Sequence, residues 1–158
     1  MSDWYLEAID GTEHKASFVK ATAADAKNMK WTSGLSWLKE VKNITRSVYK
    51  LVDKSGTILG GLSISDEDDH IFIHLVESAP HMRSGVVPPR YYVNIPRLLI
   101  GFAGKTSIDL GYDGFLALTP KTNKRDYFAT QFNAVPVYGR NMGIYGVVSS
   151  NLVGLYYK

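Results

Sequence analysis

The stretch RYYVNIPRLLIGFAGKTSIDLGYDGFLAL, from Arg90 to Leu118, decides the fold that this sequence predicts. Apolar residues recur in it at helical spacing and form one face of a helix: Ile95, Leu98, Leu99, Phe102, Ala103 and Leu110. Gly111 ends this helix where a positive φ is commonly needed, and Phe115 to Leu118 follows as an apolar run typical of a strand covered on both faces. We therefore expect a loop, a helix that packs on a sheet, a glycine turn and a buried strand.

The start of this helix predicts a site for phosphate. A loop leads into it from a strand that ends in HLVESAP, His74 to Pro80. The first N–H groups of a helix lack intrahelical partners and carry the positive end of the helix dipole. A ligand that bears phosphate is therefore the first functional expectation.

The composition describes one ordinary globular domain, which we place at residues 1–158. The chain has 45% apolar and 21% charged residues, and its net charge of +3 comes from basic residues scattered along the sequence. This favours an anionic ligand over nucleic acid, because no basic run marks a binding stripe. The absence of cysteine excludes disulfides, thiolate nucleophiles and zinc–thiolate sites. With no secretory signal and no membrane-spanning stretch in view, we expect a cytoplasmic protein.

The first 45 residues predict a strand and two helices. Trp4 to Ile9 has the pattern of a strand, Phe18 to Met29 contains an alanine-rich piece typical of a helix, and Trp31 to Val41 is a second helix with Ser33 as its cap.

An antiparallel meander of three strands follows. Its strands are expected at 47–52, 57–64 and 70–77, and the third is the most apolar and so central. The acidic turn at 66–69 is interpreted as a solvated loop, since consecutive carboxylates lack the spacing of a calcium site.

After the central helix and strand, a short helix is expected at 122–132, an extended segment from Val135 to Tyr145, and a last helix from Ser149 to Tyr157. The fold class is therefore mixed α+β.

This order of elements resembles the GNAT superfamily of acyl-coenzyme A N-acyltransferases, and more narrowly a group of small bacterial GNAT-like proteins. The resemblance covers residues 46–158, and the first 45 only by element order. The segments that carry it are HLVESAP, YVNIPRLLIGFAGKTSIDLGYDGFLAL, DYFATQF, RNMGIY and NLVGLYY. It implies a single domain with a central mixed sheet of about six to seven strands flanked by helices, acetyl-coenzyme A as co-substrate, no metal, and pairing of two copies through the carboxy-terminal strands and helices.

The loop before the central helix departs from the family pattern. GNAT proteins usually carry glycines there, which let the backbone approach the coenzyme pyrophosphate, whereas this chain has Asn94 and Pro96. Asparagine tolerates left-handed backbone and proline suits a first helical turn, but proline supplies no N–H. Arg97 or Arg90 would then assist with its guanidinium.

The resemblance implies a set of coenzyme-binding residues. A splayed strand would offer its backbone to the pantetheine arm, the loop and helix start would receive the pyrophosphate, and a polar residue would touch the arm. These residues are Leu75, Val76, Tyr92, Val93, Asn94, Ile95, Arg97, Leu98 and Asn123.

Glu77 is the candidate general base for acyl transfer. It ends an apolar strand, where burial would move its basicity toward the working range, and the family often uses a glutamate from this strand. The alternative is that Glu77 pairs with an arginine such as Arg83. His74, three residues earlier, is expected on the opposite face as a packed core residue.

Tyr127 is the candidate acid that protonates the leaving thiolate. YFATQF resembles the Tyr-x-x-x-Gly-Phe piece in which the family tyrosine reaches the coenzyme sulfur, with Gln131 in place of glycine. The alternative is a tyrosine packed in the core.

The sequence thus supports two main functions of different class, and a small nucleic-acid binder that uses the basic excess and the tyrosines is a third, less favoured one. One is an N-acetyltransferase whose acceptor is a small amine, an aminoglycoside-like molecule, a peptide amino group, a lysine or an aminoacyl-tRNA. The other, suggested by the missing glycines, is a catalytically inactive GNAT-shaped protein that binds or inhibits a protein partner.

Overall fold

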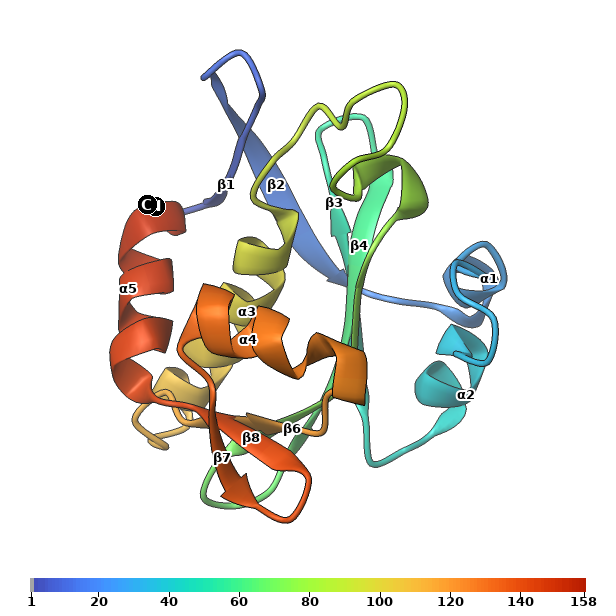
Figure 1. Ribbon diagram of the computed structural model, residues 1–158. Helices are drawn as coiled ribbons and strands as arrows, with labels where there is room; N and C mark the ends of the chain where they lie inside the picture. The colour runs from blue at the N-terminus through green and yellow to red at the C-terminus, as the bar shows by residue number, and fades with distance from the viewer. Residues whose placement is uncertain (1) are drawn as a thin grey trace.

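The computed structural model describes residues 2–158 as one eight-stranded sheet with helices on both faces (Figure 1). Its strands are β1 Trp4–Glu7, β2 Glu13–Lys20, β3 Ser47–Val52, β4 Ile58–Asp66, β5 Ile71–Ser78, β6 Leu116–Leu118, β7 Val135–Tyr138 and β8 Asn141–Ile144. Their order across the sheet is β1-β2-β3-β4-β5-β6-β8-β7, and only the pair β5–β6 is parallel. The mixed α+β class is confirmed, with eight strands in place of the predicted six to seven.

Helices cover the two faces unequally. They are α1 Ala23–Lys27, α2 Trp37–Lys42, α3 Ile95–Asp109, α4 Arg125–Phe132 and α5 Gly146–Tyr156, with short 3₁₀ turns η1 Pro80–Met82 and η2 Thr122–Lys124. Figure 1 shows α1 and α2 on one side of the sheet and α3 and α5 on the other. The two ends of the described chain meet, because Asp3 and Lys158 exchange backbone hydrogen bonds of 3.0 and 2.9 Å. None of the helices in residues 2–158 is long and apolar enough to cross a membrane.

The central helix and strand lie where the sequence predicts them. In α3, Leu98, Leu99 and Ala103 are fully buried, and all of β6 is buried. Gly111 has a φ of +86°, the left-handed value expected after a helix. Leu110 was wrongly placed on the buried face, since it caps the helix and is 47% exposed.

The amino-terminal predictions were partly wrong. Residues up to Lys20 form β2, which pairs with β1 and β3, and the helix is confined to Ala23–Lys27. A capping box between Thr22 and Asp25 fixes that start. Pairing of Ser17 to Lys20 with β3 overrides the helical tendency of this segment.

Two further boundaries differ from the prediction. Helix α2 starts at Trp37 with Ser36 as its cap, in place of Ser33. The carboxy-terminal extended segment is a hairpin of β7 and β8 that turns at Gly139, where φ is +55°.

The meander β3–β4–β5 is confirmed, and β5 lies in the middle of the sheet. Its register against β4 shifts by one residue: Leu75 is opposite Ser63, whereas Ile73 is opposite Ile64. His74 is therefore the extra residue of a β-bulge.

Candidate functional site

The neighbouring parallel strands β5 and β6 separate along their length. They pair only at Ile71–Ile73 with Leu116–Leu118, although β5 continues to Ser78. Beyond Ile73 the open edge of β5 borders a cleft of about 860 Å³, whose other walls come from α4, the start of α3 and the loop that precedes α3. The split begins at the bulge residue His74.

Alternate residues of β5 direct their backbone N–H and C=O groups toward this gap. The amide of Ala79 donates to Leu59 in β4 at 2.8 Å, so the backbone groups of Glu77 and Leu75 face β4 as well. Those of Val76 and Ser78 then face the cleft, and Arg83 Nε indeed donates to the Ser78 carbonyl at 3.2 Å. Of the two predicted strand contacts, Val76 presents backbone to the cleft and Leu75 only lines it with its side chain.

The loop before α3 is held against β1. The amide of Val93 donates to the Glu7 carbonyl at 2.9 Å. The side chain of Asn94 is buried, accepts from the Glu7 amide at 2.8 Å and donates to the Tyr5 carbonyl at 3.2 Å. Its φ is −119°, so the left-handed conformation considered for Asn94 is not used. The side chain of Asn94 therefore fixes the loop.

The first turn of α3 offers fewer amides than a glycine-rich loop would. Pro96 has no N–H, and the Leu98 amide donates to the Asn94 carbonyl at 3.1 Å. This leaves the amides of Ile95 and Arg97 in the turn. Tyr92 is buried against β1, so its side chain is not part of the cleft wall.

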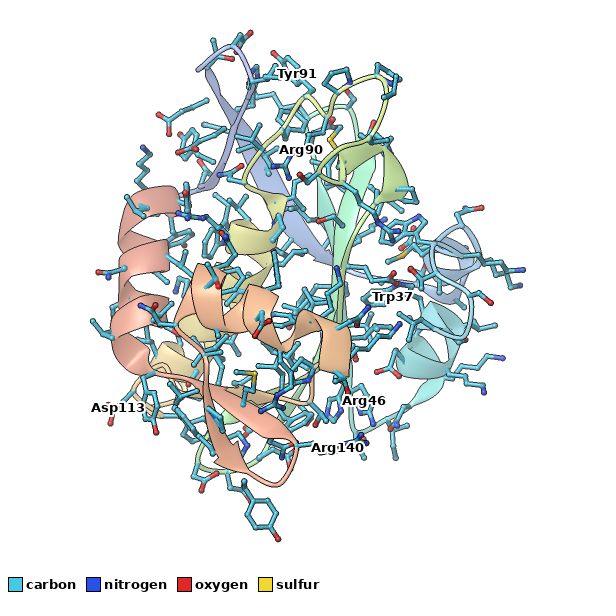
Figure 2. The ribbon with its side chains drawn as sticks, in the orientation of Figure 1. Trp37, Arg46, Arg90, Tyr91, Asp113 and Arg140 are labelled. Atoms are coloured by element: carbon cyan, nitrogen blue, oxygen red, sulfur yellow. The ribbon has the colours of Figure 1, made fainter. Side chains whose placement is uncertain are left out.

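Positive charge dominates the cleft. Five cationic side chains line it, and the single carboxylate among the lining residues is Glu77; the cations are Arg83, Arg90, Arg97, Lys121 and Lys124. Figure 2 shows Arg90 beside Tyr91 in the loop that leads into α3. Asn123, predicted to touch the coenzyme, is exposed and lies outside the lining residues. Such a surface suits a polyanionic ligand.

Glu77 lies at the wall of the cleft with its carboxylate already engaged. Oε2 accepts from the Thr32 hydroxyl at 2.5 Å and from Arg83 at 3.2 Å, and Oε1 accepts from Trp37 Nε1 at 2.7 Å. The side chain is only 7% exposed. The predicted pairing with Arg83 is present. Thr32 and Trp37 are partners that sequence could not reveal, because they lie 45 and 40 residues away along the chain.

The bulge overturns the prediction that His74 and Glu77 face opposite sides. His74 Nε2 lies 2.6 Å from Ser65 Oγ, and Ser63, two residues earlier in β4, donates to Glu40 of α2. Glu77 contacts Trp37 of the same helix, whose indole Figure 2 shows between α2 and the sheet. An extra residue resets the alternation of side chains, so both groups face the α2 side.

Tyr127 lies across the cleft from β5, on α4. Its ring packs edge-on against Phe128 and Phe132, and 38% of the residue is exposed. Burial raises the pKa of the phenol, an effect that Arg90 and Arg97 partly offset. The hydroxyl therefore carries its proton at neutral pH.

The cleft passes through the sheet. Thr32 and Leu35 line it on the α1–α2 side, whereas Arg97 and Ile100 line it on the α3 side. Both faces of the sheet therefore contribute walls to the cleft at the split between β5 and β6.

Comparison with known proteins identifies the fold. No family model and no curated protein matches the sequence. Among solved structures, AtaTR bound with AcCoA superposes with a TM-score of 0.59 at 11% identity, over 87% of this chain and 97% of that one. An acetyltransferase of the GNAT family from Listeria monocytogenes gives 0.54 at 14% identity over 98% of both chains. A spermidine N-acetyltransferase SpeG chimera from Vibrio cholerae and hSSAT gives 0.58 at 10% identity, over 86% of this chain and 98% of that one.

This chain has the GNAT fold. Identities this low establish the fold alone, and the neighbours it resembles are acetyltransferases, some of them with acetyl-coenzyme A bound. Within this GNAT fold, the structure brings Val76, Glu77, Arg97 and Tyr127 to one cleft.

Proposed function

We propose that this protein transfers an acetyl group from acetyl-coenzyme A to an amine. The observation that carries the proposal is the split between β5 and β6, which opens into a cleft with five cations and one carboxylate. Coenzyme A carries a pyrophosphate and a further phosphate, and a strand-like arm rich in amides. The cleft offers a complementary surface for both parts.

The coenzyme is placed by the backbone and by charge. Val76 and Ser78 would pair with the amides of the pantetheine arm as a neighbouring strand does. The amide of Arg97 and the guanidinium of Arg90 would receive the pyrophosphate at the start of α3, whereas Ile95 is fully buried and lies outside the residues that line the cleft. Most of the rate gain in such a reaction comes from holding two substrates together.

In this proposal Tyr127 gives its proton to the leaving thiolate. Its position on the wall opposite β5 supports this role, and its hydroxyl carries a proton at neutral pH. Glu77 as the base stays a prediction. Its three hydrogen-bond donors favour a second role, in which the carboxylate holds Thr32, Trp37 and Arg83 at the entrance for the acceptor.

An inactive binding protein is the alternative, and one observation favours it. The amide of Val93 is taken by β1 and Pro96 has none, so the pyrophosphate would find fewer donors than in a glycine-rich loop. This alternative predicts no acyl transfer to any amine and a stable complex with a protein partner. Sustained acetylation of an amine would exclude it.

Thermal unfolding with acetyl-coenzyme A, coenzyme A or buffer tests the proposal. A ligand at about 100 times its Kd stabilises the folded state by about 2.7 kcal/mol, so both coenzymes should raise the Tm by several degrees. Arg97→Ala should reduce that shift, and Lys54→Ala, an equal loss of charge in the exposed β3–β4 turn, should not. No shift in the wild type would contradict the proposal.

A further inference from the structure

We propose that His74 is the general base of the transfer, held in place by Ser65 and Glu67. This inference rests on the proposed function and names a residue that the resemblance does not supply. Its basis is a chain of hydrogen bonds from Glu67 through Ser65 to the His74 ring, at the point where β5 and β6 separate.

The chain of hydrogen bonds determines which ring nitrogen carries the proton. Ser65 Oγ is 2.5 Å from Glu67 Oε2 and 2.6 Å from His74 Nε2. A carboxylate only accepts, and a hydroxyl has one proton, so Ser65 donates to Glu67 and must accept from His74. The proton of a neutral His74 therefore resides on Nε2, and the lone pair resides on Nδ1.

Nδ1 is the nitrogen that a ligand can reach. Within residues 2–158 no hydrogen bond joins it to another protein group, and every fully buried side-chain polar atom has a partner. Nδ1 is therefore not fully buried, and His74 contributes to the wall of the cleft. Because the bulge turns this ring to the α2 side, it meets an acceptor that enters opposite to the coenzyme.

Burial of the ring favours the neutral form. Burial and Arg46, which precedes β3, lower the pKa of His74, and Glu40 of α2 and Glu67 of the β4–β5 turn oppose this in part. Phe72 packs on the ring, with centroids 4.7 Å apart. A neutral histidine at neutral pH is what a general base requires.

The proton balance of the step is complete. His74 Nδ1 takes one proton from the acceptor ammonium, and the amine nitrogen bonds to the thioester carbonyl carbon. The carbon–sulfur bond breaks with its electron pair on sulfur, which takes a proton from Tyr127. The amine nitrogen loses its second proton to solvent, and solvent returns a proton to Tyr127. His74 releases its proton to solvent.

The first test measures thiol release from acetyl-coenzyme A with a panel of primary alkylamines and with hydroxylamine, which is unprotonated at neutral pH. His74→Gln keeps a donor toward Ser65 but lacks the Nδ1 lone pair. We expect kcat/KM with the alkylamines to fall at least about 100-fold, and the inflection that titration of His74 adds to the acidic side of the pH profile to disappear. Activity with hydroxylamine, measured above its spontaneous reaction with the thioester, and the Tm shift with acetyl-coenzyme A should persist. Wild-type alkylamine kinetics in His74→Gln would overturn the inference.

A separate measurement tests whether Ser65 and Glu67 position His74. Ser65→Ala should lower kcat with KM little changed, whereas Glu67→Gln, which still accepts from Ser65, should retain most of the activity. Long-range ¹H–¹⁵N correlation spectra of the imidazole, assigned with His74→Gln, should report a neutral Nε2–H tautomer at neutral pH, even if no amine in the panel is acetylated. A protonated ring or an Nδ1–H tautomer would overturn the inference. A wild type without any Tm shift would count against the proposed function, while the spectra still decide the state of His74.

Discussion

At the scale of single residues, Tyr127 and His74 differ in how their surroundings prepare them. Burial raises the pKa of Tyr127 and lowers that of His74, so each group favours its neutral form at neutral pH. One therefore holds a proton to give, and the other holds a lone pair to receive one.

Tyr127→Phe removes the hydroxyl proposed to protonate the thiolate. We expect kcat to fall roughly 100-fold, with the Tm shift on adding acetyl-coenzyme A retained, because the ring still packs on Phe128 and Phe132. Steady-state thiol release measures the effect. Tyr138→Phe, at an 82% exposed tyrosine in β7, is the control and should match the wild type. Unchanged kcat in Tyr127→Phe would remove this residue from the mechanism.

His74 also predicts how stability depends on pH. Its pKa lies below 6.5 in the folded state, so the unfolded chain binds the proton more readily. The contribution is fully present above 6.5 and is lost as the pH falls through the folded pKa. Urea denaturation between about pH 7 and 5 should therefore show a smaller loss of stability in His74→Gln than in the wild type. Parallel curves for the two proteins would contradict this.

At the scale of elements, close contact between α3 and α5 supports the helix that begins at the cleft. Gly104 of α3 faces Ser149 of α5 so closely that a Cβ would lie 2.6 Å from the serine Cβ and Oγ. Ser149 itself donates to the Gly114 carbonyl at 2.6 Å and is fully buried.

Gly104→Ala should therefore lower the free energy of unfolding by about 1–3 kcal/mol. Gly154→Ala is the matched control in α5, since a Cβ there meets nothing within 4 Å. It should raise stability by about 0.5–1 kcal/mol, because glycine is unfavourable inside a helix. Denaturant midpoints measure both changes, and a destabilised Gly154→Ala or a neutral Gly104→Ala would refute the packing argument.

At the scale of the whole molecule, the positive charge is unevenly distributed. The net charge is only +3, yet the cleft gathers five cations around one carboxylate. A polyanion should be attracted to this opening ahead of the rest of the surface.

Binding of coenzyme A should therefore weaken as salt increases. Calorimetric titration at low and high NaCl should give a Kd that rises with ionic strength, and Lys124→Ala should show a smaller dependence. Lys54→Ala, at a residue outside those that line the cleft, should behave as the wild type does. A Kd that does not change with salt would mean that these cations do not face the phosphates.

The sequence by itself determined the elements whose signals are local. Local patterns were sufficient to predict these elements, since each pattern depends on neighbours a few residues apart. They are the apolar periodicity of α3, Gly111 after it, the apolar run of β6 and the alternation in β3 to β5. Tertiary structure alone decided β2, whose first half pairs with β1 and whose second half pairs with β3. It also decided the bulge at His74, which depends on register against β4. Only the folded structure could reveal the partners of Glu77 and the hydrogen bonds that link Glu67, Ser65 and His74. Side-chain contacts between distant segments leave no pattern in the sequence.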